Sequence, residues 1–210
     1  KDPAALVLRH QLVQAKLWGF PGGAQAVMQR YPMSDQSMPA RYARAIAMFR
    51  KGDIQNALPI IDSLTAELPE NPYFWELKGQ ALLENGRAAE AVPPLQKALK
   101  LLPNNGLIQT LAAQALIDTE KPANAAQAIK LLKQAERSEG ESASGYKYLA
   151  RAYAQTGDIP RAELATAESA LLQGDRKLAI EKAKSAQSQF KKGSPEWIRA
   201  NDVLTFASRD

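Results

Sequence analysis

The chain has 210 residues, a hydrophobic content of 45% and a formal net charge of +5, so it is long enough to bury a continuous core in one domain or in an array of repeats. It contains no cysteine and one histidine, which excludes disulfides, thiolate nucleophiles, cysteine-bound zinc and sites that need two histidines. The positive charge is spread evenly and no apolar run approaches the length of a membrane span, so neither a dedicated nucleic-acid domain nor a transmembrane segment is expected.

The first part of the chain has the pattern of two helices, over residues 4–18 and 22–31, with a turn at Pro21-Gly22-Gly23 between them. We interpret residues 1–37 as a degenerate helical hairpin. The start, Lys1-Asp2-Pro3, does not resemble a signal peptide and leads directly into a helical pattern. We therefore expect that the chain begins partway through a longer protein.

An internal repeat follows this segment. Gly52 and Gly86 are 34 residues apart, as are Pro69 and Pro103. A period of 34 residues is that of the tetratricopeptide repeat (TPR), in which helix A and helix B form an antiparallel hairpin. We predict four repeats followed by C-terminal helices that cap the array, over residues 38–71, 72–105, 106–142, 143–174 and 175–210.

The second repeat matches the TPR pattern best. Trp75 is a large residue that fills the space between the two helices, and Gly79 is small where the helices approach closely. Gly86 ends helix A, because the position after a helix often needs a positive φ. Prolines fall inside helix B of the first two repeats, at Pro59 and Pro93-Pro94, so we expect those helices to bend or to start late.

The third repeat contains an insertion. Ala128 and Leu132 match Ala91 and Leu95 at an offset of 37 residues (128 − 91) instead of 34. The three extra residues are most simply placed within residues 121–124. On this interpretation the chain is a single all-α, TPR-like solenoid of antiparallel hairpins, with about 10–11 helices.

No group of residues has the pattern of a catalytic or cofactor site. The single histidine, His10, has no acid or nucleophile that converges on it. The glycine pair at residues 22–23 lacks the Lys-Ser/Thr of a phosphate-binding loop, and acidic pairs such as Glu67 and Glu70 fall near helix ends. We predict that this chain is not an enzyme and that it holds no cofactor and no metal.

Candidate binding residues come from TPR geometry, in which helix A side chains line the concave surface. We predict a groove for a protein or peptide, aromatic and apolar in its N-terminal half and basic in its C-terminal half. In the basic half, Lys147 and Arg151 are four residues apart and could grip a carboxylate together. Three apolar members, Ile46, Phe49 and Leu83, have a second interpretation, in which they pack against a neighbouring repeat. The full set is Tyr42, Ile46, Phe49, Arg50, Tyr73, Glu76, Gln80, Leu83, Glu84, Gln114, Lys147, Arg151 and Gln155.

Three strings are more specific than the TPR pattern requires: RYPMSD (residues 30–35), PARYARA (39–45) and NPYFWELKGQALLE (71–84). They resemble the C-terminal tail of bacterial zinc metallopeptidases of the BepA type. The resemblance implies a periplasmic protein whose zinc and H-E-x-x-H helix belong to an upstream catalytic domain. This chain would then be a non-catalytic tail that recruits substrates or envelope assembly partners and contacts its own protease domain. The alternative is a stand-alone TPR scaffold or adaptor with no protease attached.

Overall fold

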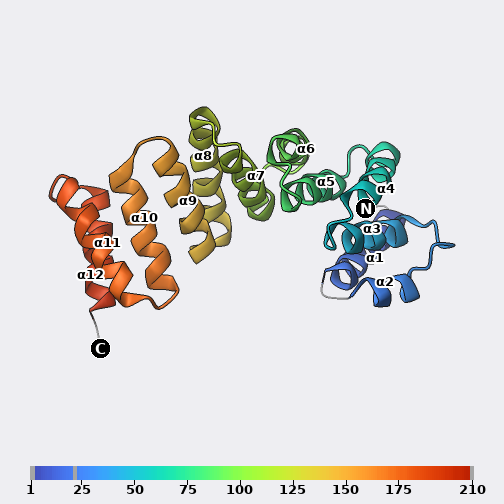
Figure 1. Ribbon diagram of the computed structural model, residues 1–210, viewed down its shortest axis with the longest axis horizontal. Coiled ribbons are helices and arrows are strands. Elements are labelled where there is room, and N and C mark those ends of the chain that lie inside the picture. The colour runs from blue at the N-terminus through green and yellow to red at the C-terminus, as the bar shows by residue number, and fades with distance from the viewer. Residues whose placement is uncertain (1–2, 21–22, 209–210) are drawn as a thin grey trace. The chain divides into compact units, whose positions relative to one another are not determined.

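The structure, a computed structural model, describes residues 3–20 and 23–208. These residues form twelve α-helices and no strand (Figure 1), which confirms the all-α solenoid and exceeds the predicted helix count. The helices are α1 (Pro3–Gly19), α2 (Ala24–Arg30), α3 (Met38–Phe49), α4 (Ile54–Glu67), α5 (Pro72–Glu84), α6 (Ala88–Leu101), α7 (Gly106–Asp118), α8 (Pro122–Glu139), α9 (Ala143–Gln155), α10 (Ile159–Leu172), α11 (Arg176–Gln189) and α12 (Pro195–Ala207). Among the described residues, no helix is both long and apolar enough to cross a membrane.

Short polar residues start most of these helices. The Ser37 hydroxyl accepts a hydrogen bond from the backbone N–H of Ala40 at the start of α3, and Asn105 caps α7 in the same way. Such caps satisfy backbone donors that have no partner inside the helix. At the other end, Gly86 follows helix A with φ +75°, a conformation that glycine adopts without steric cost.

The prolines inside helix B do not delay the helix. Both α4 and α6 begin before their prolines, at Ile54 and Ala88, so the expected late start is not observed. Pro59 and Pro93 each lie in the second turn of their helix. Near a helix start, a missing backbone donor removes little of the hydrogen-bond ladder.

The chain divides into two compact units, residues 1–103 and 104–210. In the first unit, α3 packs on α4 and α5 packs on α6, as the repeat predicts. Gly79 lies so close to Leu95 that a Cβ atom on the glycine would stand 2.3 Å from Leu95 Cγ. The close approach expected of this glycine is therefore confirmed.

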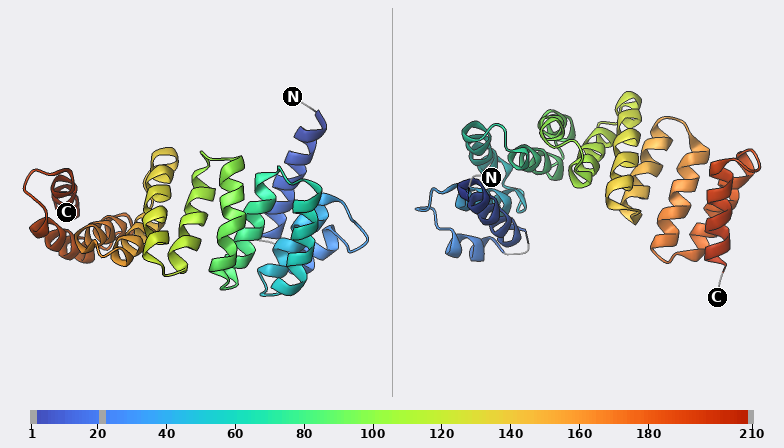
Figure 2. Two further views of the ribbon diagram at one scale, coloured as in Figure 1. Left: turned by 90° about the horizontal axis from the view of Figure 1, so that it is seen from above. Right: turned by 180° about the vertical axis from the view of Figure 1, so that it is seen from behind.

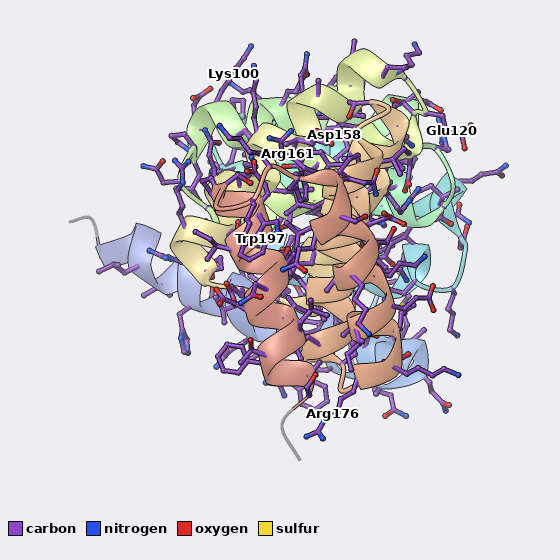
Figure 3. The ribbon with its side chains drawn as sticks, turned by 90° about the vertical axis from the view of Figure 1, so that its left-hand side faces the viewer. Lys100, Glu120, Asp158, Arg161, Arg176 and Trp197 are labelled. Atoms are coloured by element: carbon purple, nitrogen blue, oxygen red, sulfur yellow. The ribbon has the colours of Figure 1, made fainter. Side chains whose placement is uncertain are left out.

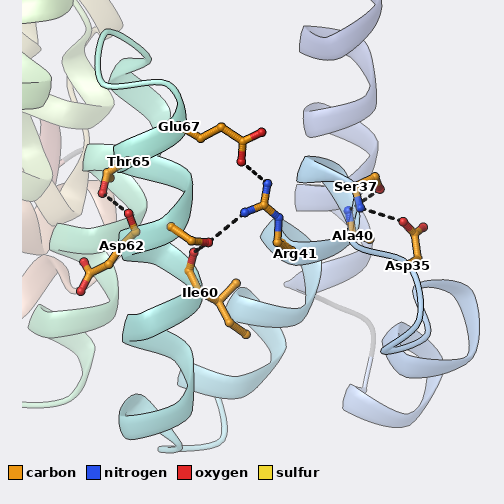
Figure 4. A network of polar contacts seen from close by, with 9 residues as sticks. Asp35, Ser37, Ala40, Arg41, Ile60, Asp62, Thr65 and Glu67 are labelled. Carbon is orange, nitrogen blue, oxygen red and sulfur yellow. Dashed lines mark hydrogen bonds and ion pairs between the residues drawn. The ribbon is translucent and has the colours of Figure 1, made fainter.

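A polar network joins α3 to α4 inside the first unit (Figure 4). The Arg41 guanidinium forms an ion pair with Glu67 and donates a hydrogen bond of 2.9 Å to the Ser63 hydroxyl. That hydroxyl in turn donates to the backbone carbonyl of Ile60 at 2.6 Å. The network links the outer faces of the first hairpin.

The first helix does not form a regular hairpin with the second. Instead, α1 packs mainly against α3, and α2 also packs against α3 (Figure 2). The predicted turn residues Pro21 and Gly22 lie outside the described residues. The position of α1 decides which groove residues remain accessible.

The second unit contains the hairpins α7–α8 and α9–α10, followed by α11 and α12. Its insertion is not at residues 121–124, because α8 begins at Pro122, 34 residues after the start of α6 at Ala88. Burial also keeps the offset of 34, since Ala125 matches Ala91 and both are fully buried. The extra residues instead lengthen the end of α8, which has 18 residues where α6 has 14.

Candidate protein-binding surface

Part of the predicted groove is covered by α1. Ile46 and Phe49 are 0% and 2% exposed, and both pack against the end of α1 and the residue after it. A Cβ atom on Gly19 would stand 2.9 Å from Ile46 Cβ, and the Phe20 ring meets the Phe49 ring edge-on with centroids 6.2 Å apart. These two side chains belong to the core, as the second interpretation of them expected, and they do not line an open groove.

The acidic groove residue Glu76 is also covered. It is 8% exposed and accepts a hydrogen bond of 3.0 Å from Lys16 Nζ of α1. Leu83 is 7% exposed and belongs to the core as well. The sequence pattern assigned these residues to the correct helices, α3 and α5, but not the helix that covers part of them.

Three predicted groove residues stay at the surface as one polar cluster. Arg50 forms an ion pair of 3.4 Å with Glu84, and Gln80 donates a hydrogen bond of 2.8 Å to the same carboxylate. The Arg50 guanidinium also lies over the Phe20 ring, 5.5 Å from its centroid. The cluster is internally satisfied, and its charges largely cancel.

The two predicted tyrosines line a cavity of about 730 Å³ within the first unit. Tyr42 of α3 and Tyr73 of α5 form one side. The N-terminal part of α1 forms another, and the turn between α4 and α5 completes the wall. We call this space the α1 cavity; its lining residues are Leu8, Arg9, Leu12, Val13, Lys16, Tyr42, Leu68, Pro69, Glu70, Asn71, Pro72 and Tyr73. Its size is in the range of ligand-binding pockets.

Two groups on the wall of the α1 cavity have no polar partner among the described residues. The Tyr42 side chain is 2% exposed, yet its hydroxyl makes no hydrogen bond there. Burial raises the pKa of this hydroxyl, and the nearby Glu76 raises it further, so the group stays a neutral donor. Arg9 is exposed and forms no ion pair in the described part of the chain.

Sequence reasoning missed the contribution of α1 to this site. A signal was present, because α1 is apolar around most of its circumference, and such a helix is normally covered on several sides. Leu12 is buried, whereas Leu6, Val13 and Leu17 are 52%, 52% and 65% exposed. The exposed face is therefore as apolar as the covered one.

In the second unit, the predicted glutamines serve the fold. Gln114 accepts a hydrogen bond of 2.9 Å from the Tyr148 hydroxyl, and Gln155 donates one of 3.0 Å to the backbone carbonyl of Ile117. Both bonds join α7 to residues of α9. These side chains therefore hold neighbouring helix A segments together.

The predicted basic pair lies at a second cavity. Lys147 and Arg151 line a space of about 330 Å³ together with residues of α10 and α11. Arg151 already forms an ion pair of 2.7 Å with Asp118, whereas Lys147 has no ion pair in the part of the chain that the structure describes. A joint grip on a carboxylate would require Arg151 to share its guanidinium with Asp118.

A second ion-pair network lies near the start of α10 in this unit (Figure 3). Arg161 forms ion pairs of 2.7 Å with both Asp158, the cap of α10, and Glu196 in the first turn of α12. Asp158, Arg161 and Trp197 lie near one another in this view. Because all three charges are paired, the network fixes α12 on α10 and leaves no charge free for a partner.

Comparison with known families identifies the repeats. The family model described as tetratricopeptide repeat matches residues 42–106 and 110–194. The chain belongs to the TPR family. TPR arrays present extended surfaces for protein partners, so this chain is a protein–protein interaction module built on a fold that is not itself catalytic. No curated protein sequence matches the chain.

Solved structures with the same fold include MamA and TTC0263. A crystal structure of MamA is 19% identical, with a TM-score of 0.57 over 78% of this chain and 91% of that one. A double mutant, MamA RS-1 ArsTM, is 18% identical, with a TM-score of 0.62 over 81% and 92%. TTC0263, a thermophilic TPR protein from Thermus thermophilus, is 18% identical, with a TM-score of 0.50 over 80% and 100%. At these identities the likeness establishes the fold alone.

Proposed function

We propose that this chain acts as a stand-alone TPR adaptor that holds a segment of a partner protein in the α1 cavity. The observation that carries the proposal is the unpartnered hydroxyl of Tyr42 on the wall of a largely apolar cavity of about 730 Å³. A buried donor without an acceptor costs free energy. A bound segment that supplies an acceptor would recover that cost while burying the apolar wall.

The extent of the structural neighbours supports an adaptor. The aligned regions cover 91%, 92% and 100% of the three neighbouring chains, so chains that consist of this kind of array recur among them. An adaptor needs only two surfaces that bind different partners, and the two units supply separate cavities for that purpose.

The second candidate function is the tail of a periplasmic zinc metallopeptidase of the BepA type. It rests on the strings at residues 30–35, 39–45 and 71–84. In the fold, the first two strings belong together, because the Arg44 guanidinium of the second donates hydrogen bonds to the backbone carbonyls of Tyr31, Pro32 and Asp35. That structural role accounts for the first two strings without a protease. On this alternative, zinc would be bound only by the catalytic domain, and the tail would recruit clients to it.

Photo-crosslinking tests the binding site. A photoreactive amino acid at Val13, on the cavity wall and 52% exposed, should give discrete adducts with partner proteins in the native host. The same probe at Leu107, which is 70% exposed on the second unit, is the control. Adducts that fade in a Tyr42→Phe background support the proposal, because this change removes only the hydroxyl. Equal adducts from both probe positions, insensitive to Tyr42→Phe, would contradict it.

The native gene product separates the adaptor from the protease tail. An antibody raised against these 210 residues would be used to measure its size and zinc content, and cell fractionation would locate it. A zinc-free product close to 22.9 kDa supports the adaptor. A much larger, zinc-containing periplasmic product would replace the adaptor with the protease tail.

A further inference from the structure

We propose that the α1 cavity selects an apolar peptide segment that carries a carboxylate, and that Arg9 and the Tyr42 hydroxyl recognise its polar atoms. This inference rests on the proposed function and names the chemistry of the partner segment at the same site. The carboxylate is that of an aspartate or glutamate side chain placed between bulky apolar residues.

The walls of the cavity determine its preference for apolar side chains. Leu8, Leu12 and Val13 of α1 face Leu68 and the prolines of the α4–α5 turn across the space. Burying apolar surface contributes roughly 25 cal/mol per Å². A cavity of about 730 Å³ accommodates several side chains, so a segment with more than one bulky apolar residue gains most from it.

Charge on the wall determines the sign of the polar residue. Three charged side chains line the cavity, and two of them are already neutralised: Lys16 by Glu76 at 3.0 Å, and Glu70 by Lys97 at 3.0 Å. Arg9 lines the cavity with no ion pair among the described residues. A carboxylate of the partner therefore gains a charge-assisted hydrogen bond from Arg9, whereas a lysine in the same place is repelled.

The Tyr42 hydroxyl supplies the second polar contact. The Tyr42 ring packs against the Phe74 ring with centroids 5.7 Å apart, and the nearby Glu76 and Tyr73 raise the pKa of its hydroxyl. Because that hydroxyl is a neutral donor without an acceptor, a backbone carbonyl or carboxylate oxygen of the bound segment would satisfy it.

The exposed face of α1 favours a peptide over a small acid. Leu6, Val13 and Leu17 are spaced seven and four residues apart, so they lie on one face of the helix, and each is at least half exposed. Val13 belongs to this face and to the wall of the cavity. A peptide longer than the cavity can therefore continue over Val13 along α1, whereas a fatty acid of the same charge would end inside.

Binding of defined peptides tests the inference. Three short fluorescein-labelled peptides, identical except for Glu, Gln or Lys at one position between leucine and phenylalanine residues, would be titrated with the full chain and followed by fluorescence anisotropy. We expect the Glu peptide to bind about tenfold more tightly than the Gln peptide, and the Lys peptide to bind most weakly. Arg9→Gln should abolish the difference between Glu and Gln, and Tyr42→Phe should weaken both about threefold.

Two control variants match these changes. Arg176 is exposed at the start of α11 in the other unit (Figure 3), so Arg176→Gln removes one positive charge without touching the cavity. Tyr31→Phe removes a tyrosine hydroxyl elsewhere in the first unit. Both should leave the preference for the Glu peptide unchanged. A preference that survives Arg9→Gln, or that disappears in Arg176→Gln, would overturn the assignment of Arg9.

Further outcomes separate this inference from the proposed function. Equal binding of the three peptides, or displacement of the Glu peptide by dodecanoate with the same dependence on Arg9, would overturn the inference, the latter in favour of a lipid site. If no peptide binds while crosslinks from Val13 persist and depend on Tyr42, the peptide chemistry is wrong and the adaptor stands. If both assays are negative, the adaptor proposal fails as well.

Discussion

Lys16 and Glu76 lie 60 residues apart in the sequence, yet Lys16 Nζ donates a hydrogen bond of 3.0 Å to Glu76 Oε1. The bond joins α1, which precedes the regular repeats, to helix A of the second repeat. The Glu76 side chain is 11% exposed and that of Lys16 is 38% exposed. The carboxylate therefore depends on this partner much more than the ammonium does.

The Lys16–Glu76 pair should contribute measurably to stability. Lys16→Ala leaves a nearly buried carboxylate without its partner, so we expect a loss of about 1 to 3 kcal/mol in the free energy of unfolding. Glu76→Gln in the same chain should restore part of that loss, because a neutral amide is less costly to bury. A double-mutant cycle in urea measures the coupling. As control, Lys97→Ala breaks the more exposed pair with Glu70 and should change stability by about 0–1 kcal/mol; simple additivity at Lys16 and Glu76 would refute the coupling.

Arg44 should be essential for the segment between α2 and α3. The residue is 1% exposed, and its guanidinium donates to the carbonyls of Tyr31, Pro32 and Asp35 at 3.3, 2.7 and 2.7 Å. A lysine ammonium lacks the planar fork that reaches several acceptors, so Arg44→Lys should cost about 2 kcal/mol or more. Limited proteolysis should then cleave the variant within residues 31–37. Arg176→Lys provides the baseline, and an unchanged digestion pattern in Arg44→Lys would show that the carbonyls do not need this donor.

Gly79 should not tolerate alanine, although alanine is the better helix former. The propensity gain is about 1 kcal/mol, whereas a Cβ placed 2.3 Å from Leu95 Cγ overpacks the core at a cost of about 1–3 kcal/mol. We expect Gly79→Ala to lower the melting temperature, and Leu95→Ala added to it to cost less than Leu95→Ala alone. Gly23→Ala is the matched control, since no atom lies within 4 Å of a Cβ atom there. A melting temperature for Gly79→Ala at or above that of the wild type would contradict the close contact.

Glu168 should make stability depend on pH. Burial raises the pKa of this carboxyl to about 7 from an ordinary value of 4.5, although the neighbouring Arg199 lowers it and Glu136 raises it slightly. In the window between those two values the folded state binds more protons than the unfolded state, so the contribution of this group is complete below the lower value and falls as the pH rises through the upper one. Glu168→Gln removes the titration, and Arg199 keeps Glu136 within 3.9 Å.

Thermal unfolding of the wild type and Glu168→Gln, compared at about pH 5 and about pH 8, measures this effect. The variant should gain on the wild type at the higher pH. Glu181→Gln, at a side chain that is 64% exposed, supplies the baseline for replacing a surface carboxylate. If the difference between Glu168→Gln and the wild type is the same at both pH values, the Arg199 ion pair keeps Glu168 charged throughout.

Much of the fold was predictable because TPR hairpins are specified locally. The caps at Ser37 and Asn105, the glycine after helix A at Gly86 and the small residue at Gly79 all act within one hairpin. Each determines a helix end or a close approach through neighbours in the sequence. The repeat period therefore suffices to place α3–α6.

The insertion shows the limit of that reasoning. Matching Ala128 to Ala91 gave a plausible offset of 37 residues, but buried positions along α8 repeat at several spacings on one helix face. Only the packing of Ala125 against its own hairpin shows that the extra residues lengthen the end of the helix.

The candidate site divides in the same way between sequence and tertiary packing. The residue pattern alone specified the family, the helix A positions and the presence of Tyr42 and Tyr73 on the inner side of their helices. It did not specify that α1 packs on α3, buries Ile46 and Phe49, and forms one wall of the cavity at Tyr42. An apolar helix carries no code for its partner, because burial is roughly proportional to area and has no direction; where α1 lies is fixed by complementary shape and by single long-range contacts such as Lys16 to Glu76.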